Sequence, residues 1–297
     1  MAVGQAYLGL AVHEYNLGKW ERALEHARRA TVAHREAGDL RGWGLTTQMI
    51  AWLLRLQGDF THSLDQSQEV VRVGQDAADH QVWAWGLHGC GRTLWHTGAL
   101  DEAVTYLQHA IELYKAIPDY QTVAEASSDL GECYLSQGKL TEALAALEES
   151  NQLIAQRRLR GVHCTRPRNG LAEAYLAMAD QAEERERAEW LRRAKRACRT
   201  ALKQSKSDRQ GMAGAYRLQG THEWLGGRPA AARKWWLRSL AVAMELEARY
   251  DLGVTNLEMG RRMGDRVYLE RAEAIFAEIG AMLDLTHARE LLNRAAA

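Results

Sequence analysis

A glycine that recurs every 40 residues is the feature that most constrains the fold of this chain. Gly18, Gly58, Gly98 and Gly138 are evenly spaced over the first half of the 297-residue sequence. A fixed period of this length is typical of solenoids, in which each repeat buries its apolar face only against its neighbours. The spacing therefore predicts a repeat protein and argues against a single central core.

Small residues keep a fixed distance from these glycines. Five residues after them stand Ala23, Ser63, Ala103 and Ala143, and seven residues before them stand Ala11, Ala51, Gly91 and Gly131. The distance between two packed helices depends on the side chains at their contact, so each repeat is expected to be an antiparallel helix pair that crosses at these positions. The periodic glycine is expected in the turn of the pair. Between repeats, turns are expected at Gly38 and Asp39 and at residues 74–76, with Gly ending one helix and Asp capping the next.

Composition supports a helical fold. The chain is 46% hydrophobic, has only 3 prolines, and carries 10 Trp and 10 Tyr but only 2 Phe. Few prolines leave few breaks in helices, and runs of β-branched residues that would form strands are missing. We therefore predict an all-α fold, a right-handed α-solenoid of about seven helix pairs with a C-terminal capping helix.

The later repeats are less regular than the first four. We predict one domain over residues 1–297, with repeats at about 4–40, 41–80, 81–120, 121–161, 162–208, 209–248 and 249–281 and a cap at 282–297. Ten extra residues around DQAEERERAE are expected to add helical turns to the fifth repeat, and Pro229 is expected to begin a helix. No comparable cap precedes Tyr7, which is consistent with a piece of a longer protein.

The segment DLGECYLSQGKLTEALAALEES, residues 129–150, resembles the tetratricopeptide repeat through Leu130, Gly131, Tyr134, Gly138 and Ala143. More narrowly, the 40-residue period and the ending LERAEAIFAEIGAMLDLTHARELL are similar to C-terminal arrays of bacterial signalling proteins. In those proteins the array follows an ATPase module that is joined to a nucleotide cyclase or a transcription regulator. The resemblance implies a scaffold that binds a protein or peptide in a concave groove, as the regulatory or sensing arm of a signalling protein.

The resemblance also implies which residues face the groove. These candidates on the first helices of repeats are Gln48, Trp52, Arg55, Trp85, His88, Arg92, Trp95, His96, Glu125, Glu132, Arg217 and Trp224. Aromatic and Arg side chains are enriched in binding hot spots, so the set predicts a contact surface that is only partly buried in the free protein. The alternative for each Trp is a place in the core.

No motif indicates catalysis, a metal or a cofactor. The glycine-rich stretch at residues 86–91 lacks the Lys-Ser/Thr of a phosphate-binding loop, and Gly91 is better explained by packing. Cys90 is expected on the core side of its helix, away from His88 and His96, so the three residues cannot share an ion. The four cysteines, Cys90, Cys133, Cys164 and Cys198, are expected to be buried thiols. We predict a non-enzymatic, soluble, cytoplasmic protein without a membrane span.

Charge is balanced overall but uneven along the chain, with 38 basic and 38 acidic residues. Residues 99–150 hold ten acidic and two basic side chains, whereas residues 157–209 hold fifteen basic and seven acidic ones. Within the basic stretch one helical stripe is expected, made of Arg192, Arg196, Arg199, Lys203 and Lys206. This stripe is either a solvated outer face or a docking site for an acidic partner or nucleic acid.

Two function classes remain open from the sequence. The first is the protein- or peptide-binding scaffold, with self-association possible through the uneven charge. The second is a small-ligand or nucleic-acid sensor that uses the groove or the basic stripe. Zero net charge makes nucleic acid the less favoured partner, because binding it requires a basic surface.

Overall fold

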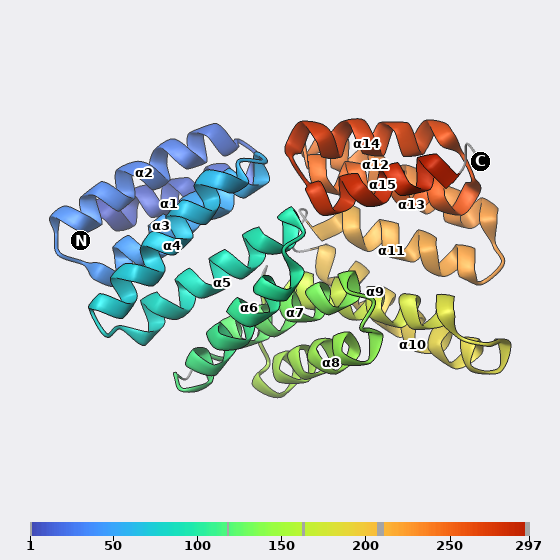
Figure 1. Cartoon of the computed structure of the whole chain (residues 1–297), viewed down its shortest axis with the longest axis horizontal. Helices are drawn as coiled ribbons and strands as arrows, with labels where there is room; N and C mark the ends of the chain where they lie inside the picture. Colours follow the sequence, from blue (N-terminus) through green and yellow to red (C-terminus); the bar gives the residue numbers. More distant parts are fainter. Residues whose placement is uncertain (1, 118, 162–163, 207–210, 295–297) are drawn as a thin grey trace. The chain divides into compact units, whose positions relative to one another are not determined.

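The computed structural model describes residues 2–117, 119–161, 164–206 and 211–294, and this part of the chain forms fifteen helices and no strand (Figure 1). The helices divide into two compact units, Met1–Asp119 and Tyr120–Ala297. We call these the N-terminal unit and the C-terminal unit and describe each by itself.

The N-terminal unit consists of three antiparallel helix pairs. The helices are α1 (Ala2–Asn16), α2 (Trp20–Glu36), α3 (Leu40–Leu56), α4 (Phe60–Asp76), α5 (His80–Thr97) and α6 (Leu100–Lys115). We call the first helix of each pair the A helix and the second the B helix.

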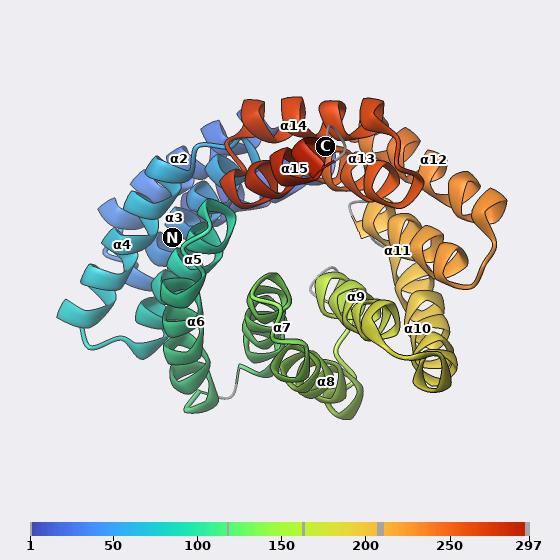
Figure 2. The same cartoon turned by 45° about the vertical axis from the view of Figure 1, so that its right-hand side comes forward.

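The C-terminal unit consists of four helix pairs and a final helix. The helices are α7 (Tyr120–Ser136), α8 (Leu140–Arg157), α9 (Thr165–Gln181), α10 (Glu184–Ser205), α11 (Met212–Leu225), α12 (Pro229–Glu245), α13 (Arg249–Met263), α14 (Arg266–Ile279) and α15 (Met282–Arg294). Within this unit the A helices and α15 follow the inner side of a curved stack, and the B helices follow its outer side (Figure 2). The predicted all-helical solenoid of seven helix pairs and a terminal helix is confirmed. The prediction of one domain over the whole chain stays a prediction.

The periodic glycines lie in the turns within the pairs. Gly18, Gly58, Gly98 and Gly138 have φ angles of 75°, 81°, 90° and 72°, in the left-handed region that other residues rarely adopt. The small residues lie at the helix crossings, where Ala23, Ser63, Ala103 and Ala143 are fully buried. A Cβ atom at Gly91 would lie 2.7 Å from Leu107 Cγ, so the close approach of α5 and α6 requires glycine there.

One of the two predicted inter-repeat turns is confirmed and the other is wrong. Gly38 has a φ angle of 65°, and the Asp39 side chain accepts a hydrogen bond from the Gly42 N–H at 2.9 Å. Residues 74–76 instead belong to α4, and the left-handed residue of that turn is Ala78, with a φ angle of 51°. Gly74 serves close packing, because a Cβ atom there would lie 2.4 Å from the Trp83 backbone nitrogen.

The extra residues of the fifth repeat lengthen its second helix, α10, as expected, whereas α9 has the ordinary 17 residues. Helix α10 has 22 residues and is the longest of the described helices, and only Ala182 and Glu183 separate it from α9. Pro229 is the first residue of α12, where its missing N–H costs nothing. Asp265 caps α14 by accepting a hydrogen bond from the Val267 N–H at 3.0 Å.

Candidate functional site

The A helices of the C-terminal unit carry charged side chains seven residues apart. Glu125 and Glu132 lie on α7, Arg166, Glu173 and Asp180 on α9, and Asp251 and Glu258 on α13. Seven residues are two helical turns, so each set lines one face of its helix. We define the inner charged face as Asp129, Glu132, Arg166, Glu173, Asp180, Arg217, Asp251, Glu258, Arg262 and Asp284.

Ion pairs join neighbouring A helices across this face. Arg166 Nη2 of α9 lies 3.0 Å from Asp129 Oδ1 and 2.6 Å from Glu132 Oε2, both on α7. Arg217 of α11 donates two hydrogen bonds to the Glu173 carboxylate of α9, at 3.2 and 3.0 Å. A bidentate pair fixes the orientation of both groups as well as their distance. The side chains of α7, α9 and α11 are therefore positioned relative to one another.

Arg262 extends the connection from α13 back to α9. Its Nη1 and Nη2 atoms lie 2.8 and 2.6 Å from the two Asp180 carboxylate oxygens. Its Nε donates to Glu258 Oε1 at 3.0 Å, and the Thr221 hydroxyl donates to the same oxygen at 2.8 Å. Burial disfavours the ionised carboxylate, but Arg261 and Arg262 outweigh it and hold the pKa of Glu258 at about 2. The ion pair of Arg262 and Glu258 thus remains charged at neutral pH.

The middle of the inner charged face has an excess of carboxylates. Burial raises the pKa of Asp251 to about 6 although Arg217 and Arg166 oppose it, and burial likewise raises the pKa of Asp284 to about 6. The Tyr250 hydroxyl donates a hydrogen bond to Asp284. Besides Glu258, which is paired with Arg262, five carboxylates lie near the two guanidinium groups of Arg166 and Arg217, those of Asp129, Glu132, Glu173, Asp251 and Asp284.

The inner charged face combines fixed groups with accessible ones. The Arg217 and Arg262 side chains are 13% and 12% exposed, whereas those of Arg166 and Glu173 are 41% and 42% exposed. Buried pairs hold the geometry, and the open side chains leave donors and acceptors within reach of a ligand.

The structure places two of the predicted residues of the C-terminal unit on this face. Glu132 and Arg217 belong to it, and Glu125 is half-buried two turns before Glu132 on α7. Trp224 is half-buried, and its ring packs on the buried Trp236 of the B helix α12, with ring centroids 5.7 Å apart. Its role in binding a partner stays a prediction.

Four predicted residues of the N-terminal unit are buried: Arg55, His88, Trp95 and His96. His88 packs edge-on against Tyr114 of α6, and His96 stacks on Phe60 of α4, so both turn toward B helices. Trp95 is only 8% exposed, and the expectation that it is partly open to solvent is wrong. A residue on an A helix has neighbours on both sides, and helical periodicity alone does not separate the groove side from the packed side.

The other four predicted residues of the N-terminal unit are half-buried: Gln48, Trp52, Trp85 and Arg92. Trp52 packs on Tyr15 of α1, with ring centroids 4.3 Å apart. Gln48 lies against α5, because a Cβ atom at Gly89 would be 2.2 Å from its Oε1 atom. Their role in binding a partner stays a prediction.

Sequence reasoning missed most of the inner charged face. The missed residues are Asp129, Arg166, Glu173, Asp180, Asp251, Glu258, Arg262 and Asp284. Their seven-residue spacing on α9 and α13 is a usable signal. It was hidden because the repeat register loosens beyond residue 150, so charged positions there could not be aligned with those of the regular repeats.

The predicted basic stripe lies along the B helix α10, with Lys206 directly after the last helical residue. All five of its side chains, those of Arg192, Arg196, Arg199, Lys203 and Lys206, are exposed. Arg192 forms an ion pair with Glu189 one turn earlier on the same helix. The stripe is therefore exposed, on a helix that does not contribute to the inner charged face, and its role as a docking site stays a prediction.

The four cysteines are free and buried, as expected. Burial raises the pKa of Cys90 and of Cys198 to about 12, so these thiols stay protonated and unreactive at neutral pH. In the described ranges no three His, Cys, Asp or Glu side chains are grouped as metal ligands. Among the described helices none has the length and apolar character to span a bilayer.

Residues 83–154 match the family described as Tetratricopeptide repeat, which confirms the resemblance over that segment. No curated protein matches the sequence.

Similar solved structures extend the likeness of fold to the whole chain. A Rap protein complexed with Competence and Sporulation Factor superimposes with a TM-score of 0.70 at 12% identity, over 97% of this chain and 75% of that chain. The Rap conjugation gene regulator of plasmid pLS20, in complex with the Phr* peptide, gives 0.64 at 13% identity, over 97% and 74% of the two chains. A tetratricopeptide repeat protein from Parabacteroides merdae ATCC 43184 gives 0.52 at 15% identity, over 100% of both chains.

Proposed function

We propose that this chain is a protein- or peptide-binding scaffold whose partner lies across the inner charged face. The observation that carries the proposal is the bidentate Arg217–Glu173 pair, which positions half-open polar groups on successive A helices. A peptide main chain presents donors and acceptors in alternation, and a face with both guanidinium and carboxylate groups can bind both. Two of the similar structures are complexes, one with Competence and Sporulation Factor and one with the Phr* peptide, which supports a peptide as the ligand.

The excess of carboxylates favours a cationic partner. With every group ionised, the five carboxylates at the middle of the face outnumber the two arginines among them. A Lys or Arg side chain of the peptide would complete the charge balance at Asp251 and Asp284. Its arrival would favour their ionised forms, so binding should strengthen as the pH rises through about 6.

The broader role we propose is regulatory. A face that binds without reactive groups suits the sensing arm of a bacterial signalling protein in the cytoplasm, as the resemblance implies. On this proposal the chain reports the presence of its partner and does not transform it.

The test is selection of peptides from a random library, followed by affinity measurements at pH 7.5 with synthetic copies. We expect the selected peptides to be rich in Lys and Arg, and Asp251→Asn to weaken binding about tenfold, which corresponds to 1.4 kcal/mol. Glu270→Gln is the matched control, because Glu270 is an exposed carboxylate on the outer helix α14. Equal losses in the two variants, with both folded by their melting curves, would place the peptide elsewhere.

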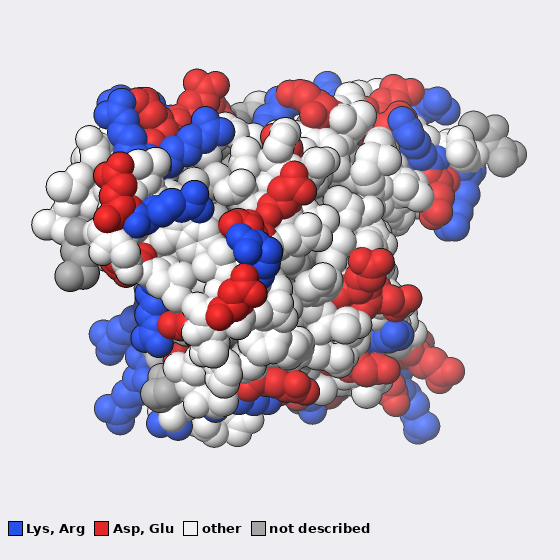
Figure 3. Space-filling model, turned by 60° about the vertical axis from the view of Figure 1, so that its left-hand side comes forward, with Lys and Arg blue, Asp and Glu red and all other residues white. Residues whose placement is uncertain are grey.

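The second candidate is a nucleic-acid sensor that uses the exposed basic stripe. Over much of the face shown in Figure 3, Lys and Arg are interspersed with Asp and Glu, and several Lys and Arg side chains gather at its lower left. Binding of nucleic acid should fall steeply as salt is raised, because phosphate contacts release counterions. If the affinity for a mixed-sequence DNA duplex hardly changes with salt, this candidate is excluded. An affinity that falls steeply with salt, together with loss of binding in Arg199→Gln, would favour it.

A further inference from the structure

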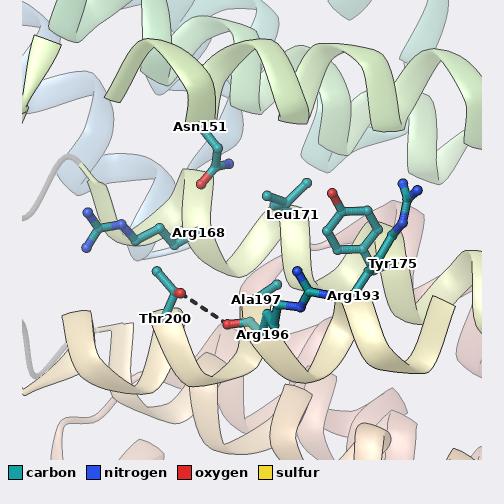
Figure 4. Close-up of a pocket in the computed structure, with 8 residues that line it drawn as sticks. All are labelled: Asn151, Arg168, Leu171, Tyr175, Arg193, Arg196, Ala197 and Thr200. Carbon is teal, nitrogen blue, oxygen red and sulfur yellow. Dashed lines mark hydrogen bonds between the residues drawn. The ribbon is translucent and has the colours of Figure 1, made fainter. Parts of the chain in front are cut away.

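A pocket of about 300 Å³ lies within the C-terminal unit between α8, α9 and α10, on the packed side of α9 (Figure 4). Three of the residues that line it are arginines: Arg168 on α9 and Arg193 and Arg196 on α10. Figure 4 shows Arg193 and Arg196 rising from α10 toward the α9 residues Leu171 and Tyr175. The pocket therefore gathers positive charge from two helices.

The charges of this pocket are poorly balanced by carboxylates. Within the described residues Arg168 and Arg196 form no ion pair, and Arg168 donates its hydrogen bond to the neutral side-chain amide of Gln204. Arg193 Nε lies 3.3 Å from Glu189. The arginines of the inner charged face, in contrast, are each paired with at least one carboxylate.

The remaining walls combine an aromatic ring with apolar and polar groups. Tyr175, Leu171 and Ala197 supply the apolar part, and Asn151 and Thr200 add polar side chains. The Tyr175 hydroxyl donates a hydrogen bond to Glu148 at 2.7 Å and accepts one from Arg193. Burial raises the pKa of Tyr175 to about 12, so the phenol stays neutral and adds no charge to the pocket. Its volume is at the lower limit for sites of small organic ligands.

We propose that this pocket binds a phosphate monoester. The forked guanidinium groups of Arg193 and Arg196 match the geometry of phosphate oxygens, and Arg168 adds charge from α9. The group esterified to the phosphate packs against Tyr175 and Leu171. The pocket lies between the A helix α9 and the B helices α8 and α10, so this inference does not depend on the peptide proposed for the inner charged face.

The test uses phenyl phosphate as the probe, with binding measured by titration calorimetry on the full chain at low salt. Arg196→Gln should weaken binding by about tenfold or more, because it removes a charge-assisted contact. The matched control is Arg185→Gln, since Arg185 is an exposed arginine near the start of α10 that neither lines the pocket nor belongs to the basic stripe. Its affinity should stay within about twofold of the wild-type value. Equal losses in the two variants, or no saturable binding by the wild type, would overturn the proposal.

Arg168→Gln is a second variant on the other helix and should also weaken binding. The pH dependence is a further readout. Phosphate gains its second negative charge near about pH 6, so the affinity for phenyl phosphate should rise between about pH 5 and 7. Benzoate carries one charge throughout this range and should bind more weakly without such a rise. Tighter binding of benzoate would overturn the phosphate assignment.

The same titration distinguishes two possible sources of the phosphate group, a phosphorylated side chain of a partner protein and a small metabolite. A peptide with one phosphoserine and its unphosphorylated copy are compared with phenyl phosphate on the wild type and on Arg196→Gln. Preference for the phosphopeptide assigns the pocket to a phosphorylated side chain of a partner, and preference for phenyl phosphate assigns it to a small metabolite. Either result supports the proposal, provided that Arg196→Gln weakens the preferred probe.

Discussion

Ala143 shows how one methyl group sets the distance between two helices. Its side chain is fully buried at the crossing of α7 and α8, and a Cβ atom at the facing Gly131 would lie 2.5 Å from Leu147 Cγ. Ala143→Leu adds three carbon atoms to this crossing and should lower the free energy of unfolding by roughly 1 to 3 kcal/mol. Urea denaturation measures the loss.

The control for this substitution is Ala145→Leu on the same helix. Ala145 is exposed, so its substitution should change stability by less than about 0.5 kcal/mol. If both variants unfold at the same urea concentration, the helices do not cross where the structure places them.

Trp95 is expected to act in folding rather than in binding. It is 8% exposed and packs against His96, with ring centroids 4.7 Å apart. Trp95→Ala should therefore cost about 3 to 5 kcal/mol of stability, the range for a buried aromatic residue. The half-buried Trp52 provides the comparison, and Trp52→Ala should cost less. A Trp95→Ala protein with a wild-type melting curve would contradict the buried placement.

Asp251 should make stability depend on pH in an unusual direction. Its pKa is raised from 3.8 to about 6 by burial, so the folded chain binds this proton more tightly than the unfolded chain does. The contribution of such a group to stability is largest below the unfolded pKa and decreases as the pH rises through the folded pKa. Asp251→Asn removes the carboxyl group and with it this dependence of stability on pH.

The free energy of unfolding of Asp251→Asn relative to the wild type should therefore increase between about pH 4 and pH 6 and then stay constant. Chemical denaturation at several pH values measures this difference. Glu258→Gln serves as a contrast, because the pKa of Glu258 is lowered to about 2 and its contribution to stability is lost as the pH falls. Parallel pH profiles for the wild type and Asp251→Asn would show that Asp251 has an ordinary carboxylate environment.

Helices α9 and α13 illustrate how elements far apart in the sequence are joined. Asp180 and Arg262 lie 82 residues apart, and their two short hydrogen bonds connect two A helices that are not consecutive. Their side chains are 28% and 12% exposed, so the pair is partly shielded from water and salt. Such a pair is therefore expected to couple the two helices more strongly than an exposed pair would.

A double-mutant cycle with Asp180→Asn and Arg262→Gln should give a coupling energy of roughly 0.5 to 3 kcal/mol. The exposed pair of Arg266 and Glu270 on α14 is the control, and its cycle should give about 0.3 to 0.5 kcal/mol. The four proteins of each cycle are compared by urea denaturation. Strict additivity for Asp180 and Arg262 would mean that the contact contributes nothing to the stack.

At the scale of the whole molecule, zero net charge conceals an acidic and a basic stretch. Residues 99–150 and 157–209 have opposite excess charge, and the basic stripe on α10 is exposed. Any association between chains through these stretches should weaken with salt, because the Debye length falls from about 30 Å at 0.01 M to about 3 Å at 1 M. Sedimentation velocity at both salt concentrations tests this expectation. A monomer at low salt would leave the charge asymmetry without a role in self-association.

The sequence alone determined the repeated helix pair. Gly98 and Gly138 identify turns because a left-handed residue is a local requirement, and Ala103 and Ala143 identify crossings because close packing excludes larger side chains. The prediction failed at Gly74, since glycine meets two needs that sequence does not distinguish: a positive φ angle and a close approach of another backbone.

The tertiary structure alone decided which polar side chains meet. Arg166 pairs with Glu132 34 residues away, and Arg262 with Asp180 82 residues away. Whether such distant residues meet depends on the angle by which each helix pair is rotated against the next. Helical periodicity leaves that angle undetermined. The packing of α9 on α10 likewise brings Arg168 to the pocket that Arg196 lines. Local patterns determined the repeat because turns and crossings are formed by neighbouring residues, whereas the candidate sites arise from the stacking of repeats.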